Sequence, residues 1–171
     1  MRHSRSALLW LVIVAVLAVV AHYVTPRRPP PGQPVTGHAR VVDGDTLNIN
    51  GQRIRLFGID APEREQDCRD DAGRSYACGR EATRALTAAI AGRVVTCTPV
   101  DHDRYNRDVA VCTAEGDDLS EAMVRSGHAL DLARHSRRRY ADAERDARDA
   151  RRGLWAGSFD APAAWRRQQV N

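Results

Sequence analysis

The chain has 171 residues and a formal net charge of +4, and all 26 of its basic residues are arginines. This length accommodates one domain of ordinary size with short appendages and excludes an array of several such domains. The first 38 residues hold four of the arginines and no acidic residue, which leaves 22 basic and 22 acidic residues in the remainder. The remainder is formally neutral, so its overall charge gives no indication of a polyanionic partner.

The N-terminal segment, residues 1–24, has the pattern of a signal peptide or a membrane anchor. Two arginines in the first six residues precede an apolar run from Ala7 to Ala21. The run lies at the lower limit for a helix that spans a bilayer, and it also suits the core of a signal peptide cleaved after Ala21. Both alternatives predict a location outside the cytoplasm. The protein is then either anchored in the membrane by residues 7–24, facing the periplasm or the exterior, or secreted.

A proline-rich linker follows, because residues 25–37 contain five of the eight prolines. Such a segment is stiff and extended, and it predicts a spacer in front of a domain over residues 38–157. The tail, residues 158–171, contains Trp165-Arg166-Arg167. Its sequence leaves open whether it packs on the domain or frays.

The domain begins with a predicted β-hairpin. Strands at residues 46–49 and 52–57 flank Asn50-Gly51, the strongest short-range hairpin signal. A two-residue turn at this dipeptide pairs Thr46 with Arg55. Strict alternation then places Asp45 on the opposite face from Arg55, so a bulge or the end of the strand has to redirect Asp45.

The four cysteines form an even set without a C-x-x-C pair, which favours two disulfides in an oxidising compartment over a zinc site. A second predicted hairpin, with strands at residues 93–98 and 109–113, places Cys97 opposite Cys112 within disulfide reach. Cys68 and Cys78 are then left to form the second disulfide. The alternative is four free, buried thiols in a cytosolic protein.

Apolar spacing predicts helices in three regions. The first covers residues 79–91, in which apolar residues recur every four positions. The second begins at Asp118, which has Glu121 three residues later in a capping-box-like pattern. The third has a narrow, alanine-rich face and ends near Gly153. That face consists of Tyr140, Ala143, Ala147, Ala150 and Leu154. Short strands followed by helices, without βαβ alternation, predict an α+β fold.

Candidate metal ligands lie in two short motifs, residues 42–46 and residues 55–63. Cleavage of a phosphodiester requires a cation near the non-bridging oxygens, a positioned water and positive charge where negative charge accumulates. Asp45 and Asp60 are the candidate ligands, with the backbone carbonyl of Ala61 beside them. These hard oxygen donors suit calcium, because the same motifs contain no histidine or thiolate.

The motif at residues 55–63 and a third motif at residues 103–107 supply the other catalytic groups. Glu63 stands three residues after Asp60, close enough to order or deprotonate an attacking water. Arg55 and Arg107 can each donate paired hydrogen bonds to phosphate oxygens and remain charged throughout. The pattern predicts phosphodiester chemistry.

Together, the segments at residues 42–46, 55–63 and 103–107 resemble the motifs of the staphylococcal nuclease (thermonuclease) family. The resemblance covers roughly residues 39–155, which is about what one domain of this length should fill. It implies a five-stranded OB-type β-barrel with three helices. It also implies the roles of the site residues. Asp45, Asp60 and the Ala61 carbonyl bind calcium, Glu63 acts on water, and Arg55 and Arg107 bind and stabilise the phosphate.

The substrate-binding residues match the family less closely. Tyr105 corresponds to the family's tyrosine in the segment 103–107, with Asn106 in place of the usual glycine. The tyrosines that flank the nucleotide in the staphylococcal enzyme have no clear match after Gly127. His135 is the candidate to stack on a base in their place.

The sequence therefore predicts a calcium-dependent endonuclease that acts on DNA and RNA outside the cytoplasm and prefers single strands. The resemblance implies 3′-phosphate ends. One alternative is a non-catalytic OB-type module that binds nucleic acid while tethered in the cell envelope. Another is an envelope-tethered scaffold whose barrel contacts protein. Besides nucleic acid, the membrane is a predicted partner if the N-terminal segment is not cleaved.

Overall fold

The computed structural model describes residues 10, 12–16, 32–103, 105 and 107–169. The predicted signal peptide or anchor lies largely outside these residues, and the linker lies partly outside them. Among the described residues, no helix combines the length and the apolar character needed to cross a membrane.

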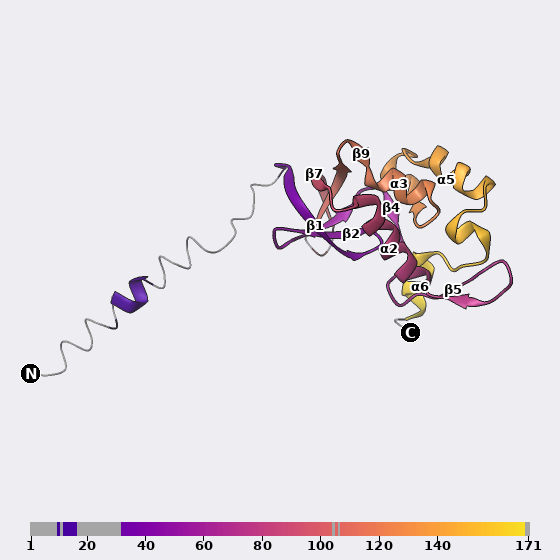
Figure 1. Ribbon diagram of the computed structural model, residues 1–171, viewed down its shortest axis with the longest axis horizontal. Helices are drawn as coiled ribbons and strands as arrows, with labels where there is room; N and C mark the ends of the chain where they lie inside the picture. Colours follow the sequence, from indigo (N-terminus) through magenta and orange to yellow (C-terminus); the bar gives the residue numbers. More distant parts are fainter. Residues whose placement is uncertain (1–9, 11, 17–31, 104, 106, 170–171) are drawn as a thin grey trace, which may run out of the picture.

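Five strands close into a β-barrel (Figure 1). Neighbouring strands are antiparallel in the order β3-β2-β1-β7-β8, and a parallel pairing of β3 with β8 closes the barrel. The strands are β1 (Val35–Asp43), β2 (Thr46–Ile49), β3 (Gln52–Leu56), β7 (Val94–His102) and β8 (Asp108–Ala114). This architecture confirms the predicted α+β fold with a five-stranded, OB-type barrel.

Short strands extend and flank the barrel. In the main sheet, β9 (Asp117–Asp118) pairs with β8. A two-stranded sheet joins β4 (Ile59–Asp60) to β10 (Leu130–Asp131), and another joins β5 (Cys68–Arg69) to β6 (Ser75–Tyr76). The pairing of β4 matters for the site, because it fixes the strand that carries Asp60.

Helices occur in all three predicted regions, as α2 (Cys78–Ile90), α3 (Leu119–Arg125) and α5 (Ala141–Asp149). Figure 1 shows α3 and α5 side by side at one end of the barrel. The structure adds a short α4 (Ala133–Ser136), a 3₁₀ turn η1 (Gly153–Ala156) and α6 (Pro162–Gln168). The predicted tail therefore includes a helix, and it lies near β5 in Figure 1.

The first hairpin has the predicted register. Thr46 pairs with Arg55, and the turn residues Asn50 and Gly51 both have positive φ angles, of 53° and 85°. This is the type I′ geometry that the Asn-Gly dipeptide favours. One boundary differs from the prediction, because β1 begins at Val35 and pairs with β7 from that residue. The last residues of the expected linker are thus part of the barrel.

The structure contains both predicted disulfides. Cys97 and Cys112 lie opposite each other on β7 and β8, and both are fully buried. Cys68 and Cys78 join β5 to the start of α2. Two disulfides fit an oxidising compartment.

Two details of the predicted helices are corrected. Asp118 caps α3 by accepting hydrogen bonds from the backbone N–H groups of Ser120 and Glu121, but the Glu121 carboxylate pairs with Arg125 instead of completing a capping box. The third predicted helix, α5, ends at Asp149, which leaves Ala150 exposed outside the predicted face.

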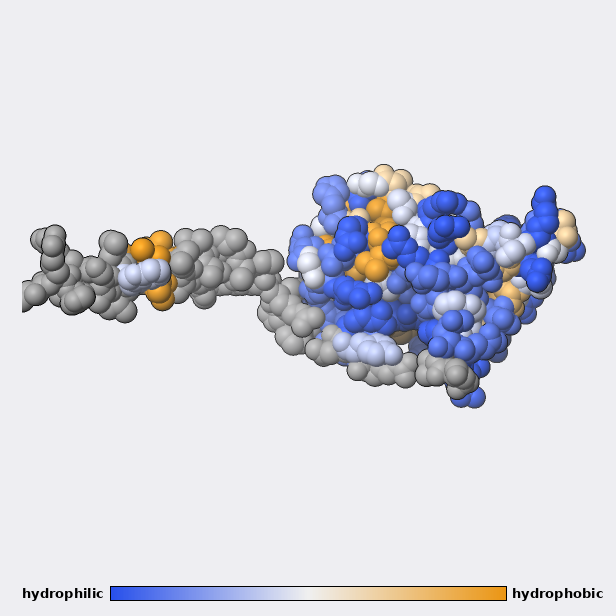
Figure 2. All heavy atoms as spheres, turned by 90° about the horizontal axis from the view of Figure 1, so that it is seen from below, coloured by the Kyte–Doolittle hydropathy of each residue, from blue (hydrophilic) through white to orange (hydrophobic). Residues whose placement is uncertain are grey.

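The core fills the barrel and the space between the barrel and the helices. Its largest fully buried side chains include Leu47, Ile54, Leu86, Met123 and Tyr140. The surface is mostly hydrophilic on the face seen in Figure 2. The exposed large apolar side chains described in the domain are Val94, Val100 and Tyr105. Scattered apolar residues of this kind are normal on a folded surface.

We predict that Tyr140→Phe lowers the free energy of unfolding by about 1 kcal/mol. Tyr140 is 1% exposed, and its hydroxyl donates to Asp118 Oδ2 at 3.1 Å, so the substitution removes a partly buried hydrogen bond to a carboxylate. Urea unfolding measures the change. Tyr76→Phe is the control, because the Tyr76 hydroxyl has no hydrogen bond among the described residues. An equal loss in both variants would contradict the assignment.

Candidate active site

A cleft of about 380 Å³ opens at the end of the barrel where β1 turns into β2. It gathers residues from all three motif segments. The predicted site residues that line it are Asp45, Arg55, Ala61, Glu63, Tyr105 and Arg107. Asp60 lies beneath it with 2% of its surface exposed. The fold thus brings predicted site residues that are up to 62 positions apart in the sequence, from Asp45 to Arg107, into one site.

Asp45 reaches the cleft because it lies in the turn between β1 and β2, outside the alternation of either strand. The register of β1 with β2 shifts between Val41 and Asp43, which is the irregularity that the hairpin pattern requires. Gly44 allows the turn to pack closely. A Cβ at Gly44 would lie 2.7 Å from both the Ala61 and the Ala82 Cβ atoms.

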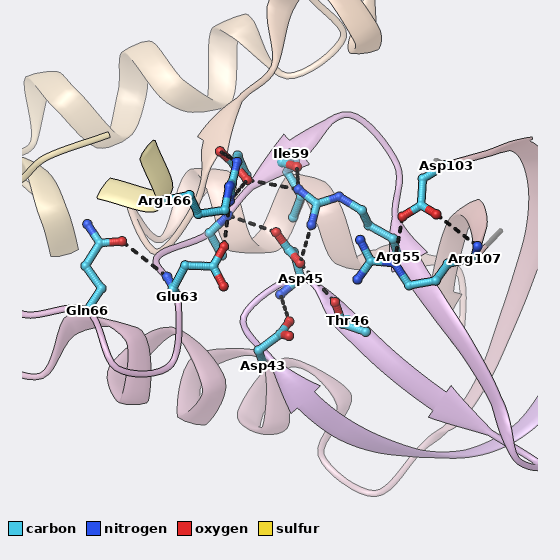
Figure 3. A network of polar contacts seen from close by, with 12 residues as sticks. Asp43, Asp45, Thr46, Arg55, Ile59, Glu63, Gln66, Asp103, Arg107 and Arg166 are labelled. Carbon is cyan, nitrogen blue, oxygen red and sulfur yellow. Dashed lines mark hydrogen bonds and ion pairs between the residues drawn. The ribbon is translucent and has the colours of Figure 1, made fainter. Parts of the chain in front are cut away.

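Arg55 joins the two predicted metal ligands. Its Nη1 donates to Asp45 Oδ1 at 3.0 Å, and its Nη2 donates to Asp60 Oδ1 at 2.9 Å (Figure 3). Asp45 Oδ2 accepts from the backbone N–H of Ala61 at 3.1 Å, and Thr46 Oγ1 donates to Asp45 Oδ1 at the same distance. These bonds fix both carboxylates relative to the turn that carries Ala61.

Burial is the largest single influence on the pKa of both members of this pair. It raises the pKa of Asp45 to about 7, although the positive charge of Arg55 opposes the change. Burial also acts to lower the pKa of Arg55, but Asp45 and Asp60 outweigh it and raise that pKa above its usual value. Arg55 therefore stays charged, while the Asp45 carboxylate stands in surroundings that favour a further positive charge.

Arg166, on α6, also contacts the site. Its Nη1 and Nη2 donate to the two oxygens of Asp60, each at 3.0 Å, and Nη1 also donates to Glu63 Oε1 at 2.6 Å. In the view of Figure 3, Arg55 and Arg166 lie on opposite sides of Asp45. Burial alone would lower the pKa of Arg166, but its hydrogen bonds to Asp60 and Glu63 raise it.

Glu63 is held from two directions. Its backbone N–H donates to Gln66 Oε1 at 3.2 Å, and its carboxylate meets Arg166. The first turn of α2 packs directly against the Glu63 backbone. A Cβ at Gly79 would overlap with the carbonyl oxygen of Glu63, so only glycine fits there.

Arg107 is the last residue of the loop that joins β7 to β8. The Asp103 carboxylate organises this loop by accepting from the backbone N–H groups of Tyr105 and Arg107 at 2.9 Å and from Arg107 Nε at 2.6 Å. Burial alone would raise the pKa of Asp103, but these bonds lower it. The Arg107 guanidinium lies 5.6 Å from the Tyr105 ring centre. Asn106, which stands where the family has a glycine, lies outside the described residues.

Residues 53–157 match the family model described as staphylococcal nuclease homologue. The chain belongs to this family. Membership supports a nuclease function and, with it, nucleic acid as the class of substrate. It also agrees with the barrel, although the family match begins after the first two strands of the structure.

Three relatives illustrate the breadth of the staphylococcal nuclease family. The chain is 38% identical to the succinoglycan biosynthesis protein ExoI of Rhizobium meliloti, over 81% of this chain and 74% of that protein. It is 33% identical to an "Uncharacterized endonuclease" of Escherichia coli O157:H7, over 76% of this chain and 83% of that protein. It is 36% identical to the "Probable staphylococcal-like nuclease CAN3" of Oryza sativa, over 74% of this chain but 32% of the rice protein.

Two site residues depart from the family-based prediction. His135 is exposed on α4 and is not among the residues that line the cleft with Tyr105. Arg166 was not predicted. Pro162 at the start of α6 is a helix signal that the sequence offers, but no pattern links a residue in the tail to Asp60.

The donor set fits a hard cation, although the described residues contain no cluster of three or more His, Cys, Asp or Glu side chains arranged to hold a metal. A carboxylate oxygen can accept at two positions. Among the described residues, Asp45 Oδ2 accepts from the Ala61 N–H and Asp60 Oδ2 from Arg166, so each retains an acceptor position. With the Ala61 carbonyl and water, these oxygens match the preference of calcium.

We predict that Gly79→Ala lowers the free energy of unfolding by about 1–3 kcal/mol, because the added methyl group forces Glu63 and α2 apart. Chemical denaturation measures the loss. Arg80→Ala, at an exposed position in the same turn of α2, should change stability by less than about 0.5 kcal/mol. Equal stability of Gly79→Ala and the unaltered chain would contradict the close packing at Glu63.

Proposed function

We propose that the chain is a calcium-dependent endonuclease that hydrolyses phosphodiester bonds of DNA and RNA outside the cytoplasm and leaves 3′-phosphate ends. One observation carries the proposal. The cleft of a nuclease-family barrel holds two linked carboxylates, a third carboxylate and separate guanidinium groups within one small volume. This combination matches the needs of phosphodiester cleavage.

Asp45, Asp60 and the carbonyl of Ala61 are the groups that would hold calcium. The ion, when bound, supplies positive charge to the non-bridging oxygens of the phosphate. Asp45 supports this assignment, because its buried carboxylate is most readily kept ionised by another positive charge nearby. Arg55 keeps both carboxylates in place for that purpose.

Glu63 is the proposed general base. Its side chain is 33% exposed at the cleft, so water can reach it, and its ion pair with Arg166 holds the carboxylate in place. Glu63 takes a proton from the attacking water as the water oxygen bonds to phosphorus. The bond from phosphorus to the 5′ oxygen breaks, which leaves the phosphate on the 3′ end, and solvent protonates the departing oxygen.

Arg55 and Arg107 bind the phosphate in this proposal. Both line the cleft, and a guanidinium remains charged while negative charge accumulates on the phosphate oxygens. The bond from Arg107 Nε to Asp103 fixes the side chain on its loop. Arg55 is more constrained, because it also serves the two buried aspartates.

Tyr105 supports the proposed preference for single strands. It lines the cleft with 68% of its surface exposed, and an exposed ring next to a phosphate site can stack on an unpaired base. His135 has no part in this proposal, because it is not among the residues that line the cleft. The arrangement supports contact with unpaired bases without selecting a particular one.

The proposed location is the periplasm or the exterior of the cell. Two disulfides support an oxidising compartment, and the predicted N-terminal segment supplies either an anchor or a cleaved signal. Membrane attachment through residues 7–24 is proposed only for the uncleaved form.

A non-catalytic nucleic-acid-binding module is the second candidate. The observation that favours it is the ion pairing of Arg166 with Asp60 and Glu63, which resembles a purely structural cluster of charges. This candidate predicts binding of oligonucleotides without cleavage.

We predict that the full chain cleaves a fluorescent single-stranded DNA with calcium and loses this activity in a chelator. Glu63→Gln should lower the rate by about 100-fold to 10,000-fold, because it removes the base while preserving shape. Gel analysis of the products measures both effects. The matched control is Glu65→Gln, which changes an exposed carboxylate two positions away. Full activity of Glu63→Gln would exclude the proposed base, and binding without cleavage would establish the second candidate.

We also predict that Arg107→Ala lowers the cleavage rate by about 100-fold to 1,000-fold, because it removes a charge that stabilises the transition state. Arg53→Ala, on the exposed side of β3, is the control for the loss of one arginine near the same hairpin. Steady-state kinetics measures the cleavage rates of the two variants. Equal rates for Arg107→Ala and Arg53→Ala would remove Arg107 from the mechanism.

A further inference from the structure

The C-terminal segment is fastened to the loop that carries Glu63. Arg69 and Ser158 exchange two backbone hydrogen bonds, of 2.9 and 3.0 Å, which join the tail to β5. Gln66 adds a side-chain bridge. Its Oε1 accepts from the Glu63 N–H, and its Nε2 donates to the backbone oxygen of Asp160 at 2.8 Å. The same amide therefore sets the position of Glu63 and of the chain that leads into α6.

The disulfide between Cys68 and Cys78 lies within this attachment. It ties β5 to α2, and the backbone oxygen of Gln66 accepts from the Gly79 N–H at 3.2 Å. Pro162, at the first position of α6, is buried. These contacts anchor the chain around α6, whose Arg166 lines the cleft.

The helix α6 places the Arg166 side chain at the site. Its three hydrogen bonds to Asp60 and Glu63 use a planar, two-pronged geometry that a lysine side chain cannot reproduce. The Glu63 carboxylate accepts a hydrogen bond from Arg166, which fixes its direction in the cleft. The orientation of Glu63 therefore depends on a residue 103 positions away in the sequence.

We propose that Arg166 is a positioning residue of the nuclease site, so that the C-terminal segment completes the active site by holding Glu63 against Asp60. The inference rests on the proposed function, which assigns Glu63 as the base. Arg166 acts through the two carboxylates, and its own contacts leave an acceptor position on Asp60 Oδ2. It can therefore remain in place when a cation binds.

The anchoring of α6 distinguishes this role from that of an inhibitory cation. An inhibitory residue has to leave the carboxylates before the site can work, and a segment built for release needs few contacts with its surroundings. Here the chain before α6 is held by paired backbone bonds and by Gln66. These contacts favour a permanent place for Arg166 in the site.

The test compares Arg166→Ala with Arg167→Ala in the full chain. Arg167 is the adjacent arginine on α6, is exposed and does not line the cleft. Arg166→Ala should lower kcat by about 10-fold to 100-fold with little change in KM, the usual range for residues that orient other catalytic groups. Arg167→Ala should retain kcat. Circular dichroism confirms that each variant folds, and Arg166→Gln replaces Arg166→Ala if the latter does not fold.

A double-mutant cycle with Glu63→Gln identifies the route of the effect. If Arg166 acts through Glu63, Arg166→Ala should change kcat by less than about threefold in the Glu63→Gln background. Thermal unfolding in a chelator supplies a readout without catalysis. There, the two substitutions together should lower Tm by less than the sum of their separate effects.

Three outcomes would overturn the inference. Unchanged or faster cleavage by Arg166→Ala, beside an active unaltered chain, would exclude positioning and leave the proposed function standing. Full additivity of the two substitutions, in kcat and in Tm, would show that Arg166 acts independently of Glu63. Absence of cleavage by the unaltered chain would instead reject the proposed function, and this inference with it.

Discussion

The ion pairing of buried Asp60 is the constraint on which the rest of the site depends. An aspartate with 2% of its surface exposed needs cationic partners to offset the loss of hydration, and here Arg55 and Arg166 both pair with it. Removing either arginine leaves buried negative charge without full compensation. The cluster therefore links β3, β4 and α6 into one unit, although these elements are distant in the sequence.

The backbone around the cluster is shaped by close packing. Gly44 lets the β1–β2 turn approach Ala61, and Gly79 lets α2 approach Glu63. At both positions a side chain would displace a predicted catalytic or metal-binding residue. The barrel supplies a fixed frame, and these two glycines set how closely the functional turns pack against it. This combination produces a site held by rigid elements, as electrostatic catalysis requires.

Local chemistry explains what the sequence could predict. The Asn50-Gly51 turn determines the register that pairs Thr46 with Arg55, and the register of the second hairpin places Cys97 opposite Cys112. The motifs shared with the family predicted the barrel and most of the residues that line the cleft. Arg166 could not be predicted, because its role arises from the docking of α6, which depends on tertiary contacts of Gln66 and Ser158. His135 illustrates the opposite case, since its place near Gly127 in the sequence did not bring it to the cleft.

Calcium binding by the full chain tests the central claim most directly. Isothermal titration calorimetry on the metal-free protein should show one calcium ion bound per chain, and Asp45→Asn should abolish this binding because it removes a buried, charged ligand. Asp67→Asn, at an exposed carboxylate near the same loop, should bind as the unaltered chain does. Equal calcium affinity of Asp45→Asn and the unaltered chain would contradict the account, because the cation would then bind elsewhere.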